Sequence, residues 1–152
     1  MLTVVVCDLN GFKQINDHYG HLEGNRLLRQ ISETLRHNCR EYDYVARMGG
    51  DEFVLLLLGK EQGAIDERIA QLERLKWNAG RDDEIYRVSM SVGAAVFPQD
   101  GADADELLAE ADRRMYKAKQ EFKQKRMEAA GGAVAVVAAA QPDDDWEMAA
   151  AQ

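Results

Sequence analysis

The sequence predicts an α+β domain in which helices flank a single β-sheet, with the elements in the order β-α-β-β-α-β-α. Two patterns support this prediction. Some segments are short apolar runs that are β-branched or alternate with other residues, as in strands. Between them lie segments whose apolar residues recur every three or four positions, as in amphipathic helices. A Gly-Gly turn between the two middle strand candidates indicates a β-hairpin.

The first half of the chain supplies one strand, two helices and the hairpin. The first strand ends at Asp8 and is apolar and β-branched, which is typical of a buried strand. The short first helix is closed by Gly20, and the second carries a single apolar stripe. We expect a strand over 2–7, helices over 12–19 and 23–36, and strands over 42–48 and 53–58, with the turn Gly49–Glu52 inside the hairpin.

The second half supplies a helix, a strand and a last helix. Apolar residues at 65, 69, 72 and 75 predict a helix that ends by Gly80. Residues 86–97 alternate between apolar and other residues, the period of a strand. A turn at 98–101 leads to the last helix, with Asp103 as its expected N-cap and an apolar stripe from Leu107 to Phe122.

This order predicts a ferredoxin-like βαββαβ sheet with helices on one face. A right-handed crossover from the first to the second strand leaves a gap that the third strand fills, antiparallel to the first. The end of the first strand then lies beside the start of the third. Asp8, Asp51 and Glu52 are therefore expected to converge at one edge of the sheet.

Composition limits the classes of function. The 152 residues carry a net charge of −8 and a pI of about 4.9, which argues against a basic surface for a nucleic acid polymer. Half of that charge lies in residues 129–152, which contain four acidic residues and no Lys or Arg. Cys7 and Cys39 are isolated, and there is no signal peptide or membrane segment, so we expect a cytoplasmic protein.

Converging carboxylates repel one another unless a cation neutralises them. Oxygen ligands combined with substrate phosphates suit Mg²⁺ or Mn²⁺, which activate a hydroxyl and stabilise a leaving pyrophosphate. The alternative is that Asp8 only ends a strand and that Asp51 only fills a turn. Polar and basic residues along the chain occur in an order that suits contacts with the base and phosphates of a nucleotide: Lys13, Asn16, His21, Asn25 and Lys119. Each of them taken alone is an ordinary surface or capping residue.

Five blocks of sequence, in order, resemble the GGDEF domain of diguanylate cyclases over about residues 2–124. They are Cys-Asp-Leu-Asn-Gly-Phe-Lys-Gln-Ile-Asn-Asp at 7–17, Tyr-Gly-His-Leu-Glu-Gly-Asn at 19–25, Arg-Glu-Tyr-Asp at 40–43, Ala-Arg-Met-Gly-Gly-Asp-Glu-Phe at 46–53, and Ser-Val-Gly at 91–93 with Ala-Asp-Arg-Arg-Met-Tyr-Lys-Ala-Lys at 111–119. The resemblance implies a palm-type fold like that of nucleotidyl cyclases. It also implies an enzyme that condenses two GTP molecules into cyclic di-GMP and two pyrophosphates.

The same resemblance implies roles for individual residues. Asp8, Asp51 and the Leu9 carbonyl would bind Mg²⁺ or Mn²⁺, and Asp51 with Glu52 would be catalytic. The expected guanosine-binding residues are Asn16, His21 and Asn25, and the expected phosphate-binding residues are Lys13, Lys119 and Lys123. Arg40 and Asp43 match the RxxD product-inhibition site of the family, with a plain Arg–Asp pair at a strand start as the alternative. Catalysis would need a homodimer, with one GTP in each domain.

The sequence departs from the family in several places. Asn10 and Asn25 stand where the family usually has Asp, and Phe122-Lys123 replaces a Gly-Arg pair. The helix that precedes the first strand in the family, with its Leu-Thr-Gly-Leu and Asn-Arg signature, is missing from the sequence. We expect a GGDEF domain over 1–128 and a flexible, Ala-rich, acidic tail over 129–152.

Three hypotheses follow from the sequence. The first is a Mg²⁺-dependent diguanylate cyclase with product inhibition through Arg40 and Asp43. The second is a catalytically weak GGDEF module that binds GTP or cyclic di-GMP as a signalling domain, which Asn10 and Asn25 favour. The third is a ferredoxin-like domain whose acidic edge has no function.

Overall fold

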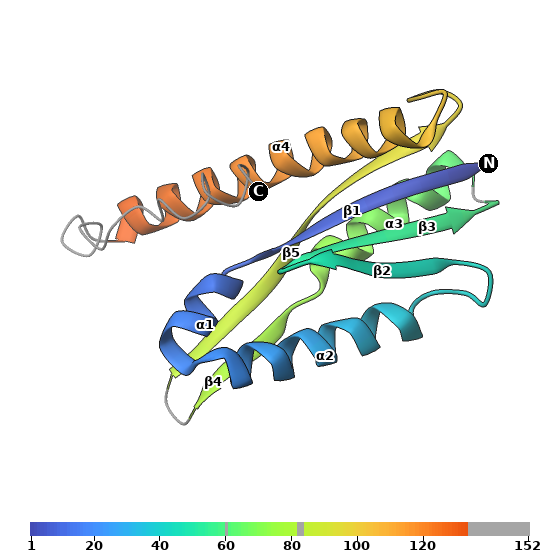
Figure 1. Ribbon diagram of the computed structural model, residues 1–152. Coiled ribbons are helices and arrows are strands. Elements are labelled where there is room, and N and C mark those ends of the chain that lie inside the picture. The colour runs from blue at the N-terminus through green and yellow to red at the C-terminus, as the bar shows by residue number, and fades with distance from the viewer. Residues whose placement is uncertain (60, 82–83, 134–152) are drawn as a thin grey trace. The chain divides into compact units, whose positions relative to one another are not determined.

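The computed structural model describes residues 1–59, 61–81 and 84–133 of the chain (Figure 1). The chain divides into two compact units, residues 1–119 and residues 120–152. In chain order the elements are β1 (Leu2–Asn10), α1 (Phe12–Tyr19), α2 (His21–His37), β2 (Tyr44–Gly49), β3 (Glu52–Leu58), α3 (Gln62–Arg74), β4 (Trp77–Arg81), β5 (Glu84–Phe97) and α4 (Ala104–Ala133).

The five strands form one antiparallel sheet in the order β2-β3-β1-β5-β4. β3 lies between β1 and β2, as the expected crossover requires. The strands β5, β1, β3 and β2 reproduce the ferredoxin-like order, and β4 extends the sheet at the β5 edge. The predicted α+β fold is confirmed.

Helices cover both faces of the sheet, so the prediction that they share one face is wrong. Side chains of β1 alternate between two apolar clusters, as the strand period requires. Val5, Cys7 and Leu9 pack in the cluster that includes buried residues of α1, α2 and α3. Val4 and Val6 pack with Leu107, Ala111 and Met115 of α4, which lies across the sheet from α1 and α2 (Figure 1).

The contact between β5 and α4 depends on Gly93. A Cβ atom built on Gly93 would collide with the Ala111 carbonyl oxygen and the Met115 backbone nitrogen. Those atoms belong to helix backbone and cannot turn away. Gly93 therefore sets how closely α4 approaches the sheet, which the sequence pattern alone did not indicate.

The segment after α3 is a strand, whereas the sequence predicted a helix that ends by Gly80 and no strand before residue 86. α3 ends at Arg74, and Leu75 already has an extended backbone. Trp77 and Ala79 are buried while Asn78 between them is exposed, which is the period of a strand and not of a helix. β4 pairs along its whole length with β5, and this pairing overrides the helical stripe that precedes it.

Several predicted boundaries are confirmed. α1 spans Phe12–Tyr19, and Gly20 closes it with a φ of 84°, a conformation that favours glycine. The Asp103 side chain accepts a 2.9 Å hydrogen bond from the Glu106 backbone N–H, as an N-cap does. α4 continues to Ala133, so the first residues of the expected tail are helical. The rest of that tail lies outside the described residues.

Candidate active site

Asp8 lies near the carboxyl end of β1, directly opposite Glu52 at the start of β3. The convergence predicted from the topology is therefore confirmed for this pair. The Leu9 backbone N–H donates a 3.1 Å hydrogen bond to the Asp51 carbonyl oxygen, which fixes the hairpin turn against β1. Asp51 and Glu52 are both half-buried, so this edge combines acidic groups with restricted access to water.

Lys119 of α4 supplies a cation at the same edge. Its Nζ atom lies 2.9 Å from Asp8 Oδ2, and the two side chains are only 8% and 12% exposed. The other carboxylate oxygen, Asp8 Oδ1, is buried without a hydrogen-bond partner among the described residues. Because a buried polar atom without a partner is costly, Asp8 has unused capacity to bind a ligand.

The electrostatics reflect the crowding of acidic groups. Burial raises the pKa of Asp8 to about 6, with Asp51 and Glu52 adding to the rise and Lys119 opposing it. Burial also raises the pKa of Glu52, helped by the nearby carboxylates of Asp112 and Asp51. Asp112 of α4 thus belongs to the acidic surroundings, a role that the sequence did not predict. A bound cation would relieve this repulsion.

The residues present fit a divalent ion that is shared with a substrate. Among the described residues, no three His, Cys, Asp or Glu side chains are grouped so that they could hold a metal alone. Mg²⁺ does not require such a cage, because one or two carboxylates, water and substrate phosphates usually complete its shell. Asp8, with its unpartnered Oδ1, and Asp51 provide two carboxylates, and β1 provides the Leu9 carbonyl.

Asn10 has a structural role between β1 and β5. Its amide donates to Ser89 Oγ and its carbonyl oxygen accepts from Ser91 Oγ, both at 3.0 Å. All three side chains are buried between β1 and β5. A neutral amide can make both bonds at once, whereas a carboxylate there could only accept.

Two of the three predicted guanosine-binding residues come from the start of α2, and the third packs against it. His21 and Asn25 are exposed and lie four residues apart, on the same face of the helix. A Cβ built on Gly24 would collide with Asn16 Oδ1. Gly24 therefore lets the Asn16 side chain lie directly against α2, next to Asn25.

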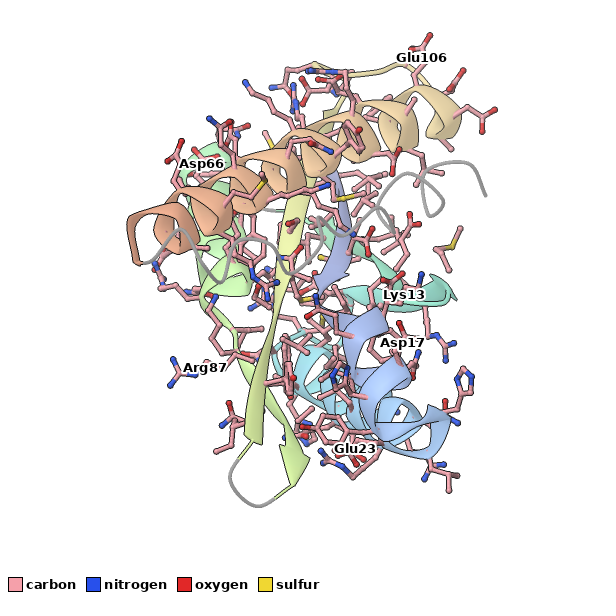
Figure 2. The ribbon with its side chains drawn as sticks, turned by 90° about the vertical axis from the view of Figure 1, so that its left-hand side faces the viewer. Lys13, Asp17, Glu23, Asp66, Arg87 and Glu106 are labelled. Atoms are coloured by element: carbon pink, nitrogen blue, oxygen red, sulfur yellow. The ribbon has the colours of Figure 1, made fainter. Side chains whose placement is uncertain are left out.

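The predicted phosphate-binding lysines differ in burial and in the compact unit to which they belong. Lys119 is buried beside Asp8, whereas Lys13 is exposed on the first turn of α1 (Figure 2). Lys123 belongs to the second compact unit. The structure thus brings Lys119 to the Asp8 carboxylate.

A groove of about 330 Å³ runs along α2 and reaches β2, and sequence reasoning found only one of its residues, Asn25. Leu28 forms its apolar wall, and Arg47 reaches it from the strand before the Gly-Gly turn. The Arg47 Nε atom donates a 3.0 Å hydrogen bond to the Gly50 carbonyl oxygen. The groove is lined by Asn25, Leu28, Arg29, Ser32, Glu33, Arg36 and Arg47.

Arg40 and Asp43 form a closed turn at the start of β2. Arg40 donates from Nε and Nη2 to the two Asp43 carboxylate oxygens at 3.0 and 2.9 Å, and from Nη2 to the Leu58 carbonyl at 2.7 Å. The guanidinium also lies 4.4 Å from the centre of the Tyr42 ring. Burial acts to raise the pKa of Asp43, but hydrogen bonds from Arg40 and Leu58 lower it on balance. The pair joins β2 to the end of β3.

Comparison with known proteins identifies the family of the chain. The family described as "Diguanylate cyclase, GGDEF domain" matches residues 1–125. The chain belongs to the GGDEF family. Within the described part of this GGDEF domain, no helix is long and apolar enough to cross a bilayer.

Curated relatives carry GGDEF-like sequence within longer chains. The bifunctional diguanylate cyclase/cyclic di-GMP phosphodiesterase MucR of Pseudomonas aeruginosa is 40% identical, covering 78% of this chain and 17% of its own. The cyclic di-GMP phosphodiesterase PdeR of Escherichia coli is 43% identical over 77% and 18%, and the diguanylate cyclase DosC of Escherichia coli is 37% identical over 78% and 26%. The GGDEF domain thus spans about a quarter or less of these relatives.

Solved structures match the same fold. A sensory box/GGDEF family protein from Caulobacter crescentus superposes with a TM-score of 0.70 at 34% identity, covering 79% of each chain. A microbial GGDEF domain whose structure describes an interaction with cyclic di-GMP superposes with a TM-score of 0.56 at 31% identity, covering 79% of this chain and 73% of its own.

Proposed function

We propose that this GGDEF domain is a diguanylate cyclase that condenses two GTP molecules into cyclic di-GMP and two pyrophosphates. The observation that carries the proposal is the acidic edge of the sheet, where Asp8 faces Glu52 and keeps one buried oxygen without a partner. The relatives MucR and DosC, both named as diguanylate cyclases, support this choice of reaction.

The acidic edge would hold a divalent ion and position the reacting hydroxyl. Asp8, Asp51 and the Leu9 carbonyl are the ligands for Mg²⁺ or Mn²⁺. When bound, such an ion polarises a phosphoryl group and lowers the pKa of an attacking hydroxyl. Asp51 accepts the proton of the 3′-hydroxyl, whose oxygen then bonds to the α-phosphorus of the second GTP as pyrophosphate leaves. Glu52 adds negative charge that favours this proton transfer.

The substrate would lie between α2 and the acidic edge. In this proposal guanosine meets Asn16, His21 and Asn25, and the position of all three near the junction of α1 and α2 supports the choice. Lys13, Lys119 and Lys123 are the phosphate-binding residues of the proposal. Each domain takes one GTP, so the active form is a homodimer in which two domains face each other, and the expected location is the cytoplasm.

Product inhibition would act through Arg40 and Asp43. A guanidinium fork can bind both a phosphate and the acceptor edge of guanine. The Arg40 side chain is 35% exposed, so a ligand can reach it even while it holds Asp43. The solved GGDEF domain with cyclic di-GMP at 31% identity supports binding of the product by this family.

The test is product formation by the purified protein. Incubated with GTP and Mg²⁺, the wild type should form cyclic di-GMP and pyrophosphate, followed by chromatography. Asp51→Ala should form neither, while Asp66→Ala, on the exposed surface of α3, should behave as the wild type. No cyclic dinucleotide from wild type at any protein concentration would overturn the proposal.

A second candidate is a GGDEF module that binds GTP or cyclic di-GMP without significant turnover. The ion pair between Lys119 and Asp8 favours it, because the ammonium already neutralises a metal ligand. PdeR, which is 43% identical and named as a phosphodiesterase, shows that a similar sequence occurs in a protein named for another activity. Retention of GTP without product in the same assay would support this candidate.

A further inference from the structure

We infer that Arg29 recognises the guanine base through its O6 and N7 atoms, an inference that rests on the proposed function. The groove along α2 has a volume of about 330 Å³, within the range of small-molecule sites. It begins at Asn25, one of the residues proposed to meet guanosine. Leu28 is the apolar residue of its lining.

The charge of the groove selects one edge of the base. Guanine offers donors at N1 and N2 on one edge and acceptors at O6 and N7 on another. Asn25 is neutral, so it binds the donor edge without the help of a charge. Three arginines and a single glutamate line the groove, and an arginine fork pairs with O6 and N7 together. The groove therefore favours recognition at the acceptor edge.

Arg29 is the arginine best placed for this contact. It follows Asn25 by four residues, which puts the two side chains on one face of α2, about 6 Å apart. Arg36 follows Asn25 by eleven residues, or about 16 Å along the helix axis. Arg47 is held against the hairpin turn by its bond to the Gly50 carbonyl. Asn25 and Arg29 can thus contact two edges of one base.

The experiment compares three guanine analogues that cannot react. 2′,3′-Dideoxy-GTP, its 7-deaza form and dideoxy-ITP all lack the 3′-hydroxyl, so they bind without condensation. The 7-deaza base lacks the N7 acceptor, and hypoxanthine lacks the N2 amino donor. With Mg²⁺ present, calorimetry on the wild type should show the 7-deaza analogue about 10-fold weaker than dideoxy-GTP, and dideoxy-ITP within about threefold.

Variants of two arginines on the same helix make the test specific. Arg29→Gln, which loses the charged fork, should bind dideoxy-GTP and its 7-deaza form equally. Arg26→Gln is the matched control, because Arg26 is held by two bonds to Glu23 at 2.7 and 2.9 Å and does not line the groove. It should keep the 10-fold preference.

The other possible results distinguish a failure of the inference from a failure of the proposed function. If dideoxy-ITP is the weak ligand and the 7-deaza form is not, the base is recognised at its donor edge and the inference is wrong, although the proposed function stands. Persistence of the 10-fold preference in Arg29→Gln also overturns the inference. If the wild type binds none of the three nucleotides, the proposed function itself fails, and the inference falls with it.

Discussion

Lys119 Nζ lies 2.9 Å from Asp8 Oδ2, in a pair that joins the last helix to the first strand and is almost shielded from water. A lysine this deeply buried needs a negative partner, and so does the carboxylate. The pair therefore stabilises the contact between α4 and β1, and it holds a cation at the position where a divalent ion is proposed to bind. Lys119 and the proposed ion would therefore share one carboxylate, and each would weaken the hold of the other on it.

Replacing Lys119 by Met should destabilise the domain and increase the stabilising effect of metal. Met has a similar length but leaves the buried Asp8 carboxylate without its cation, at a cost of about 3 kcal/mol. Urea unfolding at pH 8 measures this loss. Added Mn²⁺ should raise the thermal midpoint more in Lys119→Met than in the wild type, because the ion no longer competes with the ammonium.

Lys117→Met is the control for this experiment, since Lys117 is exposed on the same helix. It should unfold at the same urea concentration as the wild type. If Lys119→Met is as stable as Lys117→Met, the ion pair does not stabilise the domain.

Gly93→Ala should be strongly destabilising. The new methyl group would meet the backbone of α4 at Ala111 and Met115, so the helix or the strand must move. We expect a loss of about 3 kcal/mol, the upper range for overpacking. Gly63→Ala in α3 is the matched control, because a Cβ there meets nothing within 4 Å and should add a little stability. Equal unfolding midpoints for the two variants would contradict the close packing of α4.

The sequence predicted those parts of the fold that depend on local signals. Glycine positions, the periodicity of apolar residues and side-chain capping are signals that act over a few residues. They predicted α1, the hairpin and the Asp103 cap. β4 was missed because its buried pair, Trp77 and Ala79, is too short to compete with the helical stripe before it. Which face α4 covers depends on long-range packing at Gly93, and no local pattern encodes it.

Some features of the candidate site could be predicted from the sequence, and others could not. The pairing of Asp8 with Glu52 could be predicted, because a crossover and a hairpin leave only one place for β3. The burial of Lys119 against Asp8 could not, since it depends on how α4 crosses the sheet more than 100 residues later in the chain. Arg29 and Arg36 of the groove were missed because on the sequence alone they are ordinary residues of an exposed helix face.

Asp100 should make the stability of the domain depend on pH. Its carboxylate accepts two hydrogen bonds from Arg114, at 2.8 and 2.9 Å, and one from the Val96 backbone N–H at 2.8 Å. These bonds lower the pKa of Asp100, with the Arg114 side chain contributing most. A folded pKa below the unfolded value of about 3.9 gives stability that is complete above that value and is lost as the pH falls through the folded pKa.

Asp100→Asn should therefore lose about 1 kcal/mol at pH 7, a modest value because Arg114 is partly exposed. Urea unfolding between pH 7 and pH 2.5 should show the wild type approaching the variant below about pH 4. Asp17→Asn, on the exposed side of α1, serves as the control and should follow the wild type. A constant difference between wild type and Asp100→Asn over this range would rule out the linkage.

Arg40→Ala should relieve product inhibition. The guanidinium is the one cation of the RxxD turn, so its loss removes the fork that would bind cyclic di-GMP. The product concentration that halves the initial rate should rise at least about 10-fold. Arg113→Ala removes a comparable exposed pair with Glu110 on α4 and should leave inhibition unchanged. An unaltered inhibition curve for Arg40→Ala would show that the turn only joins β2 to β3.

Binding of Mn²⁺ by the acidic edge can be measured from the free-ion signal in electron paramagnetic resonance, with 2′,3′-dideoxy-GTP present to prevent turnover. We expect the wild type to bind the ion together with the nucleotide, and Asp8→Asn and Asp51→Asn each to weaken that binding at least about 10-fold. Equal Mn²⁺ affinity in the wild type and in both folded variants would mean that Asp8 and Asp51 are not the metal ligands.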